Sequence, residues 1–505
     1  MLGLCRLWTL IWFLLDWDLH ACNTIQSRGE YAGIELLRPR LSKEAHIFLP
    51  GTEGYKNATN RWSSLFEPGL AVVVAPKTER DIQETIKYAN EVGSPFLAIG
   101  GRHGTTKALN NAKIAVGIWT RGMRTITVHE PFNKDGKGTA TVEPGVQAGE
   151  LTSTLFAQGK TAASTACDCV GVMGAMLGGG HGFLQGRYGL TTDNMVSARL
   201  VTAKGNVVTA SRTENPDLFW ALRGAGHNFG IVTSVEYRVF ERRPEKDAWA
   251  YEEYVFSHDK LGRVYELANG MIGGPVELTH YGHFERRPPV DAEHPVLPFW
   301  VIWQGPDVPS KYTAPLRALG PLSTKKGVVD ITQLNGIAGA NLSSPFCAYG
   351  AEVVLSPTGL RKYNTTALRR ALDIFASFPP HLQKSAALLE GYAVQAMRRV
   401  PDADTAYPER FNNLLASPVM IATEADDGNG NAVLRAEMKG YADQFRAALL
   451  EGSGDKRLYA YVNYASGDEG LEAVYGYDRW RLEKLRRLKK AWDPKGRMDF
   501  YNPIS

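Results

Sequence analysis

A histidine inside a glycine-rich turn is the residue of this 505-residue chain whose setting most suggests chemistry. The turn Gly100-Gly101-Arg102-His103-Gly104 follows residues 95–99, an apolar run that predicts a short buried strand. Glycines after such a strand let backbone N–H groups approach an anion closely and tolerate a positive φ. His103 is therefore a candidate ligand of a phosphate-bearing molecule, and the alternative is an ordinary tight turn.

Two further glycine-rich segments lie downstream, at residues 167–182 and 223–232. Glycine at this density disfavours the interior of a helix or strand, because each glycine costs roughly 0.5–1 kcal/mol relative to alanine. A loop wrapped tightly round a large ligand explains the composition better. A Rossmann dinucleotide site is the rival interpretation, but it requires a helix directly after the turn, and residues 105–111 begin a helix poorly.

With these loops in view, the chain resembles the FAD-linked oxidases of the berberine-bridge-enzyme-like group, within the vanillyl-alcohol-oxidase superfamily. Besides the three glycine loops, the similarity covers residues 60–62, 72–76, 142–145, 461–464, 475–476 and 492–494. Residues 245–455 match only loosely. The resemblance implies an α+β chain with a two-domain PCMH-type FAD-binding fold, in which the substrate domain carries an antiparallel sheet.

The resemblance also implies that FAD is bonded covalently to the chain. His103 falls where the family's histidine bonds to the flavin 8α-methyl carbon, and Cys167 falls where some members add a thioether to flavin C6. Imidazole nitrogen and thiolate are both good nucleophiles toward an electron-poor ring. Cys169 offers a second thiol on the same face of an extended segment, but the register against Val170-Gly171 favours Cys167. We expect Cys169 to be a small buried hydrophobe.

A larger set of residues is expected round the cofactor on the same grounds. In the family, the position of Val170 lies beside the flavin face where oxygen approaches, and a valine there goes with oxidases that release hydrogen peroxide. A β-branched core residue without such a role is the alternative. The other residues expected to bind the cofactor are Gly100, Gly101, Arg102, Gly104, Gly171, Gly178, Gly179, Gly180, Gly226, Asn228, Gly230, Ile231, Val232 and Asn463.

The catalytic base is expected on the substrate domain or just after it. Tyr461 and Tyr464 belong to a motif that matches the family near the flavin ring, and a phenol can act as a base when its pKa falls. Glu390 lies in a strand-like segment that could face the pocket. Aromatic packing and a solvated glutamate are the respective alternatives. Three histidines are weaker candidates, namely His181, His227 and His283, and no His/Cys/Asp cluster has the spacing of a metal site.

The implied activity is oxidation of a C–H bond next to oxygen or nitrogen in a small-molecule substrate. A hydride passes to flavin N5, a protein base takes a proton, and O2 is reduced to hydrogen peroxide. The sequence of residues 167–174 and 184–189 resembles fungal members that carry out tailoring steps in secondary metabolism. A carbohydrate or alcohol oxidase and a flavin-bound, non-redox cyclase or binding protein are the alternatives.

The first 22 residues differ from the rest of the chain. Residues 7–15 form an apolar run too short to cross a bilayer but suited to the core of a signal peptide. We expect a cleaved leader and a secreted or endomembrane-lumen protein, with an uncleaved tether as the alternative. Sequons at Asn57, Asn341 and Asn364 are compatible with glycosylation. The five cysteines, two of them in the leader, suggest no disulfide framework.

Charge narrows the range of partners. The net charge is only +4, and no long basic run interleaved with aromatic residues suggests nucleic-acid binding. We expect a monomer whose partners are a small substrate and O2, with no membrane span beyond the leader.

The elements that must position these residues follow from length and periodicity. A chain of this length exceeds one hydrophobic core and should divide into domains. We expect a FAD-binding domain at residues 60–242, where short apolar strands alternate with helices such as residues 79–92. Residues 247–455 should form an α+β substrate-binding domain, and residues 456–505 should return to the FAD-binding domain.

Further elements are expected in the second half of the chain. Strands are predicted at residues 249–256, 298–304 and 419–423, and helices at residues 358–378 and 432–450. Leu482, Leu485 and Leu488 recur at helical spacing and predict a solvated amphipathic helix.

Overall fold

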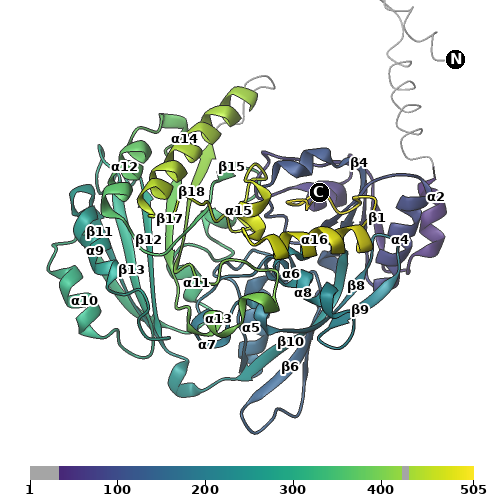
Figure 1. Ribbon diagram of the computed structural model, residues 1–505, viewed down its shortest axis with the longest axis horizontal. Helices are drawn as coiled ribbons and strands as arrows, with labels where there is room; N and C mark the ends of the chain where they lie inside the picture. The colour runs from purple at the N-terminus through teal and green to yellow at the C-terminus, as the bar shows by residue number, and fades with distance from the viewer. Residues whose placement is uncertain (1–32, 423–430, 505) are drawn as a thin grey trace, which may run out of the picture.

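The computed structural model describes residues 33–422 and 431–504, so the expected leader at residues 1–22 lies outside the described part of the chain. Within these ranges the strands form three sheets, and helices pack against them (Figure 1). The chain therefore has the mixed α+β fold that the sequence predicts.

The first sheet leads directly into the glycine turn at residue 100. Its strands are β1 (His46–Phe48), β2 (Gly69–Ala75), β4 (Lys113–Trp119) and β3 (Phe96–Ile99), in that order. Strands β2 and β3 both run parallel to β4. Helix α4 (Glu79–Glu91) covers the sheet, because Ile82 and Ile86 belong to one buried cluster with strand residues. The helix predicted at residues 79–92 is thus confirmed to within one residue.

The second sheet is antiparallel and carries the third glycine loop at the start of its longest strand. In order, its strands are β5 (Ile126–His129), β6 (Lys137–Val142), β10 (Ile231–Glu241), β8 (Met195–Val201) and β9 (Val207–Ser211), while β7 (Lys160–Thr161) also pairs with β10. Its core is shared with α5 (Ala148–Ala157), α6 (Val172–Leu177) and α8 (Pro216–Ala225).

The third sheet is the largest and is antiparallel throughout. In order, its strands are β14 (Ser323–Val329), β11 (Trp249–Ser257), β13 (Val296–Gln304), β12 (Leu278–Glu285), β17 (Ala386–Gly391), β18 (Leu414–Ala422) and β15 (Glu352–Leu355), with β16 (Thr358–Leu360) paired to β18. The strands predicted at residues 249–256 and 298–304 are confirmed, and the strand predicted at 419–423 is the end of β18 as far as residue 422.

The two faces of the third sheet have different partners. Helices α9 (Leu261–Asn269), α12 (Thr365–Ala376) and α14 (Asn431–Gly452) cover one face, on the left in Figure 1. Side chains alternate along a strand, so Phe284 and Leu389 pack under these helices whereas His283 and Glu390 point to the other face. That other face looks toward the glycine loops.

One predicted helix begins later than expected. The prediction at residues 358–378 is wrong at its start, because residues 358–360 pair with β18 as strand β16. The helix begins after Asn364, whose side chain accepts a hydrogen bond from the backbone N–H of Ala367. The helix predicted at residues 432–450 is confirmed as α14.

The C-terminal segment returns to the first half of the chain, as the yellow ribbon in Figure 1 shows. Its main helix, α16 (Arg479–Trp492), buries the predicted stripe of Leu482, Leu485 and Leu488 in the core of the second sheet. The helix is less solvated than expected, because Arg481 and Lys489 are also buried.

The remaining helices are short. They are α2 (Ile34–Leu37), α3 (Glu53–Thr59), α7 (Gln185–Tyr188), α10 (Ser310–Arg317), α11 (Leu334–Ile337), α13 (Gln395–Arg399) and α15 (Leu471–Tyr475). Among the helices of residues 33–422 and 431–504, none combines the length and the apolar character needed to cross a bilayer.

Candidate active site

A large cavity separates the glycine loops from the third sheet. Its volume is about 1130 Å³, and it is lined on one side by residues 100–104, 165–167, 170–171 and 230–232, and on the other by strands β12, β13, β17 and β18. This exceeds the volume of about 300–1,000 Å³ typical of small-molecule sites. The cavity can therefore hold an extended ligand together with a second small molecule.

The first two glycine loops meet backbone to backbone at the cavity wall. A Cβ atom added to Gly101 would overlap the backbone nitrogen of Gly171, so neither loop leaves room for a side chain at this contact. Arg102 adopts φ 61°, and its guanidinium lies 4.6 Å from the centre of the Tyr349 ring. Glycine at position 101 is thus required by the close approach of two loops of the chain. Composition alone does not distinguish such a contact from an ordinary turn.

His103 lies half-buried among aromatic rings at this wall. Its ring stacks on Trp62 at 5.2 Å between centroids and meets Tyr349 edge-on at 5.7 Å. Burial, reinforced by the charges of Arg61 and Arg102, lowers the pKa of His103 to about 3, so the imidazole is neutral. Its Nε2 is buried and has no hydrogen-bond partner among the described residues. A neutral imidazole with a free ring nitrogen is the form that can bond to carbon.

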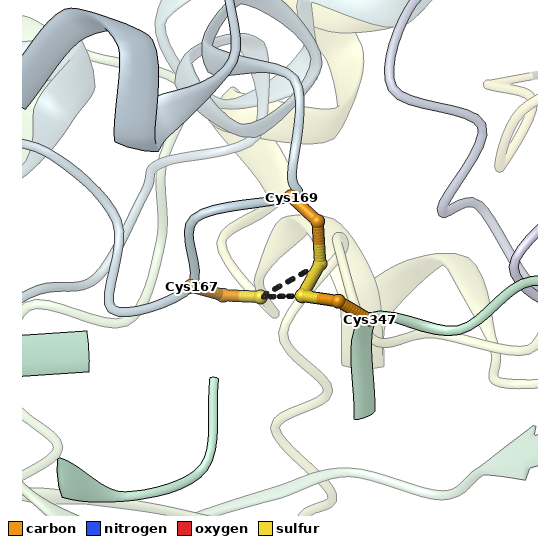
Figure 2. Close-up of side chains that lie close together, drawn as sticks. All are labelled: Cys167, Cys169 and Cys347. Carbon is orange, nitrogen blue, oxygen red and sulfur yellow. Dashed lines mark hydrogen bonds between the residues drawn. A yellow bond between two sulfur atoms is a disulfide. The ribbon is translucent and has the colours of Figure 1, made fainter. Parts of the chain in front are cut away.

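Three sulfur atoms gather at the second glycine loop (Figure 2). Cys169 forms a disulfide with Cys347, whereas Cys167 is a free thiol that lines the cavity. Burial raises the pKa of Cys167 to about 12. The expectation that Cys169 is an unpaired buried hydrophobe is wrong, because a partner 178 residues away in the loosely matching region gives no local signal.

The Gly178-Gly179-Gly180 run lies behind the cavity wall and does not line it. A side chain on Gly178 would overlap the Asn463 carboxamide, and the Gly180 N–H donates to the Tyr461 hydroxyl at 2.9 Å. The glycines therefore let the Tyr461–Asn463 segment pack closely against the loop.

The third glycine loop contributes to the cavity only in part. Gly230, Ile231 and Val232 line it, whereas Gly226 and Asn228 do not. The Asn228 side chain donates to the Tyr475 hydroxyl at 3.0 Å, so the structure assigns it a contact with the C-terminal segment. Of the other residues expected at the cofactor, Gly100, Gly101, Arg102, His103, Gly104, Cys167, Val170, Gly171 and Asn463 all line the cavity.

Glu390, on β17, is a buried acidic side chain in the sheet wall of the cavity. Tyr392 donates a hydrogen bond to its Oε2 at 2.6 Å, and Tyr464 donates to its Oε1 at 3.1 Å. Burial raises the pKa of Glu390 to about 7, with the two tyrosine hydrogen bonds opposing the shift. A carboxyl group with this pKa exchanges protons readily at neutral pH.

The two tyrosines expected as alternative bases have raised pKa values, which disfavour the loss of a proton. The Tyr461 hydroxyl accepts hydrogen bonds from Gly180 N–H and from Asn463 Nδ2 at 2.7 Å, yet burial raises its pKa. Burial and the neighbouring Glu390 carboxylate raise the pKa of Tyr464 as well. Neither phenol is therefore tuned to lose a proton near neutrality.

The three candidate histidines differ in their surroundings. The ring nitrogens of His181 form hydrogen bonds with Tyr407 Oη and Gln185 Oε1, each at 2.9 Å, and these bonds fix the orientation of the ring. His227 Nε2 lies 2.8 Å from the Gly174 carbonyl oxygen. His283, on β12, lines the cavity as the other two do, and its ring lies 5.1 Å from that of Trp300.

Sequence reasoning missed several residues that complete the cavity. The lining includes Tyr281, Trp300, Tyr349 and Tyr392. Cys347 forms a disulfide with Cys169 of the second glycine loop. Alternation along the strands could have identified Tyr281 and Tyr392 as neighbours of Glu390, since Tyr281 pairs with Glu390 across β12 and β17. No pattern in the sequence points to Tyr349 or Cys347.

Comparison with known proteins identifies what this chain is similar to. Residues 70–211 match the model of a FAD binding domain. The chain is 35% identical to the FAD-linked oxidoreductase chyH of Penicillium rubens, over 97% of this chain and 96% of that protein. It is also 35% identical to the FAD-linked oxidoreductase anuG of Penicillium roqueforti, over 95% of this chain and 94% of that protein.

The fold is shared with solved structures of lower sequence identity. A xylooligosaccharide oxidase from Myceliophthora thermophila superposes with a TM-score of 0.76 at 22% identity, over 94% of this chain and 99% of that one. At this identity the likeness concerns the arrangement of the elements and not the substrate.

Proposed function

This chain belongs to the FAD-linked oxidoreductases, and from that premise we propose that it is an oxidase with FAD bonded to His103. FAD is the cofactor of the family, and when bound it supplies the hydride-accepting and oxygen-reducing chemistry. The substrate is a small organic molecule oxidised at a C–H bond next to oxygen or nitrogen. O2 takes up the electrons and is released as hydrogen peroxide.

The residues at the cavity wall fit this cofactor. The Gly101–Gly171 contact and the turn at residues 100–104 present backbone to the cavity, as a site for a diphosphate requires. The neutral imidazole of His103, with Nε2 buried and unpartnered among the described residues, supports a bond to a ring substituent. The Cys167 thiol lines the same cavity and would supply the second bond.

Glu390 carries the catalytic part of the proposal. It is buried in the wall opposite the glycine loops, and its pKa of about 7 suits a group that takes a proton at neutral pH. Tyr464 and Tyr392 each donate to one carboxylate oxygen and hold the carboxylate in a fixed orientation. Glu390 therefore accepts the proton of the substrate's O–H or N–H group as the hydride leaves. Tyr461 orients Asn463 at the edge of the cavity.

The sheet wall supports a substrate of low polarity. Leu388, Val419 and Ile421 line the cavity beside Glu390, and Tyr281 and Trp300 add aromatic surface. Apolar lining of this kind offers fewer partners to the hydroxyl groups of a sugar, and a hydroxyl buried without a partner costs about 1–3 kcal/mol. This favours a tailoring step on a secondary metabolite over carbohydrate oxidation.

Two further features support an oxidase of the secretory route. Val170 lines the cavity next to the Gly101–Gly171 contact and leaves more room than a leucine for O2. The Cys169–Cys347 disulfide is typical of proteins that fold in an oxidising compartment. The disulfide agrees with a leader at residues 1–22 that is removed on secretion and with glycosylation at the three sequons.

The proposal is tested by mixing the purified holoenzyme with substrates in the absence of oxygen. We expect aromatic alcohols or amines, and not oligosaccharides, to bleach the flavin absorbance near about 450 nm. Readmission of O2 should restore the absorbance and release one peroxide per flavin. If no compound in a broad panel bleaches a flavin that dithionite does bleach, a non-redox role replaces the oxidase.

A further inference from the structure

The three-sulfur cluster allows more than one pairing. The Sγ of Cys167 lies 3.4 Å from that of Cys169 and 3.9 Å from that of Cys347, as the dashed lines in Figure 2 mark. An oxidising compartment joins neighbouring thiols in pairs, so one cysteine of the three must remain free. In this structure the free thiol is Cys167, the cysteine that lines the cavity.

We propose that Cys347 keeps Cys167 available for its bond to the flavin by holding Cys169 in a disulfide. The inference rests on the proposed function, because it concerns the second bond to the same FAD. Cys347 does not line the cavity, so it acts as a positioning residue. Its role is to remove the competing thiol that lies nearest to Cys167.

The loop contacts support a fixed pairing. The backbone N–H of Asp168 donates to the Ala340 carbonyl at 2.9 Å, and Asn335 donates to the Asp168 carboxylate at 2.7 Å. These bonds hold residues 167–169 against the segment that leads to Cys347. The disulfide therefore forms between two loops that hydrogen bonds already bring together.

The geometry also opposes exchange of the disulfide with the free thiol. Thiol–disulfide exchange needs a thiolate that attacks one sulfur along the line of the S–S bond. Because its two distances are similar, Cys167 lies beside the Cys169–Cys347 bond and not beyond either end. The pairing is stable until Cys167 meets a better electrophile.

The flavin is that electrophile. Formation of the thioether joins Cys167 Sγ to ring carbon C6 and removes one hydrogen from the thiol and one from the ring. The two electrons released reduce the flavin, which passes them to O2, and the two protons leave with the hydrogen peroxide that forms. A Cys167 held in a disulfide has no hydrogen to lose and cannot make this bond.

Peptide mapping of the denatured protein tests the inference. Wild type, C347S, C169S and the C169S/C347S double variant are produced as secreted holoenzymes, alkylated without reduction and digested. Mass spectrometry then identifies which fragments carry flavin and which are disulfide-linked. Flavin on the His103 fragment, together with far-UV circular dichroism, serves as the control for folding.

We expect wild type to show the Cys169–Cys347 pair and a flavin joined to the fragments of both His103 and Cys167. C347S should contain a Cys167–Cys169 disulfide, and C169S a Cys167–Cys347 disulfide, and most molecules of each should lose the flavin–Cys167 bond. The double variant has no competing thiol and should regain that bond. If the Cys169–Cys347 disulfide only stabilised the loop, the flavin–Cys167 bond would not return in the double variant, because that variant lacks the disulfide as well.

Several results would overturn the inference. They are dual attachment in C347S, no recovery in the double variant, or Cys167 within a disulfide of the wild-type protein. If the variants fail to fold, the wild-type map still tests the inference, because Cys167 within a disulfide would overturn it. Flavin on His103 alone in wild type also rejects the inference, but it leaves the oxidase proposal intact, because substrate-dependent bleaching tests that separately.

Discussion

Two buried glutamates offer a matched pair at the scale of single residues. Burial raises the pKa of both Glu390 and Glu409 to about 7. Glu390 lines the cavity, whereas Glu409 accepts a hydrogen bond from Asn412 at 3.1 Å and lies outside the cavity lining. The two carboxyl groups have similar pKa values, but only Glu390 lines the cavity. Replacing each in turn therefore separates a catalytic effect from a general effect of burial.

The E390Q variant should lose catalysis and its pH dependence together. In wild type, kcat/KM should rise as pH increases through about 7 and then level off, because the ionised carboxylate is the active form. We expect E390Q to lower kcat by about 10²–10⁴-fold and to abolish this rise. E409Q should keep the rise. A pH profile unchanged in E390Q would assign the base to another residue.

Although E390Q should lower activity, it should raise the stability of the protein at alkaline pH. A carboxyl whose pKa is raised in the folded protein binds its proton more tightly than the unfolded chain does, so its contribution falls as pH rises from about 4.5 to about 7. E390Q should therefore raise the unfolding midpoint relative to wild type at about pH 8 but not at about pH 4. Thermal scans at the two pH values measure this, and an equal shift at both would contradict a protonation effect.

Local spacing explains which site residues the sequence could reveal. His103 and Cys167 stand in short glycine segments whose meaning is contained in a few neighbouring positions. Tyr349 lines the same cavity and Cys347 forms a disulfide with Cys169, but both lie in the loosely matching middle of the chain, and nothing beside them in the sequence indicates their partners. The choice between Tyr461, Tyr464 and Glu390 also needed three-dimensional contacts, because burial sets their pKa values.

At the scale of elements, two loops depend on one backbone contact. Gly101 and Gly171 approach so closely that a methyl group on either would overlap the backbone of the other loop. We expect G101A to separate the loops, to lower the free energy of unfolding by about 1–3 kcal/mol and to reduce the fraction of chains that carry flavin.

Gly262 provides the control for this prediction. It lies in α9 with open space at its Cβ position, so G262A should be neutral or stabilise the chain by up to about 1 kcal/mol. Urea unfolding and the ratio of flavin to protein absorbance give both readouts. Full flavin occupancy in G101A would show that the contact does not shape the cofactor site.

Element boundaries were predictable where the local signals agree. Helix α4 combines a capping box at Thr78 with an apolar stripe, and strand β11 has both its predicted ends within one residue. Residues 358–360 pair with β18, a contact between distant segments, so the helical prediction there fails. Long-range pairing decides such cases, and a single sequence does not display it.

At the scale of the whole molecule, buried charges fasten the C-terminal segment to the first half of the chain. Lys489 on α16 lies 2.7 Å from Asp493 and 2.6 Å from Asp499, and it donates to the Asn228 carbonyl at 3.1 Å. The contact joins the third glycine loop to the end of the chain. Sequence periodicity indicated the helix but not this buried lysine.

Removal of that lysine should destabilise the protein strongly. K489M leaves two carboxylates close together without a cation, and we expect it to lower the free energy of unfolding by about 3–5 kcal/mol. Lys490 is exposed on the same helix, and K490M should change stability by no more than about 0.5 kcal/mol. Denaturant unfolding of both variants gives the comparison, and equal midpoints would mean that the buried pair is dispensable.

The bond between His103 and FAD is tested most directly by acid-denaturing the purified, secreted protein and mapping where flavin remains. We expect the wild-type chain to stay yellow and its His103 fragment to carry a flavin of about 780 Da, roughly FAD less the hydrogens lost, which also joins it to the Cys167 fragment. The H103A/C167A variant should give a colourless chain under the same treatment. A wild-type chain that releases all its flavin into acid, or an unmodified His103 fragment, would contradict the account.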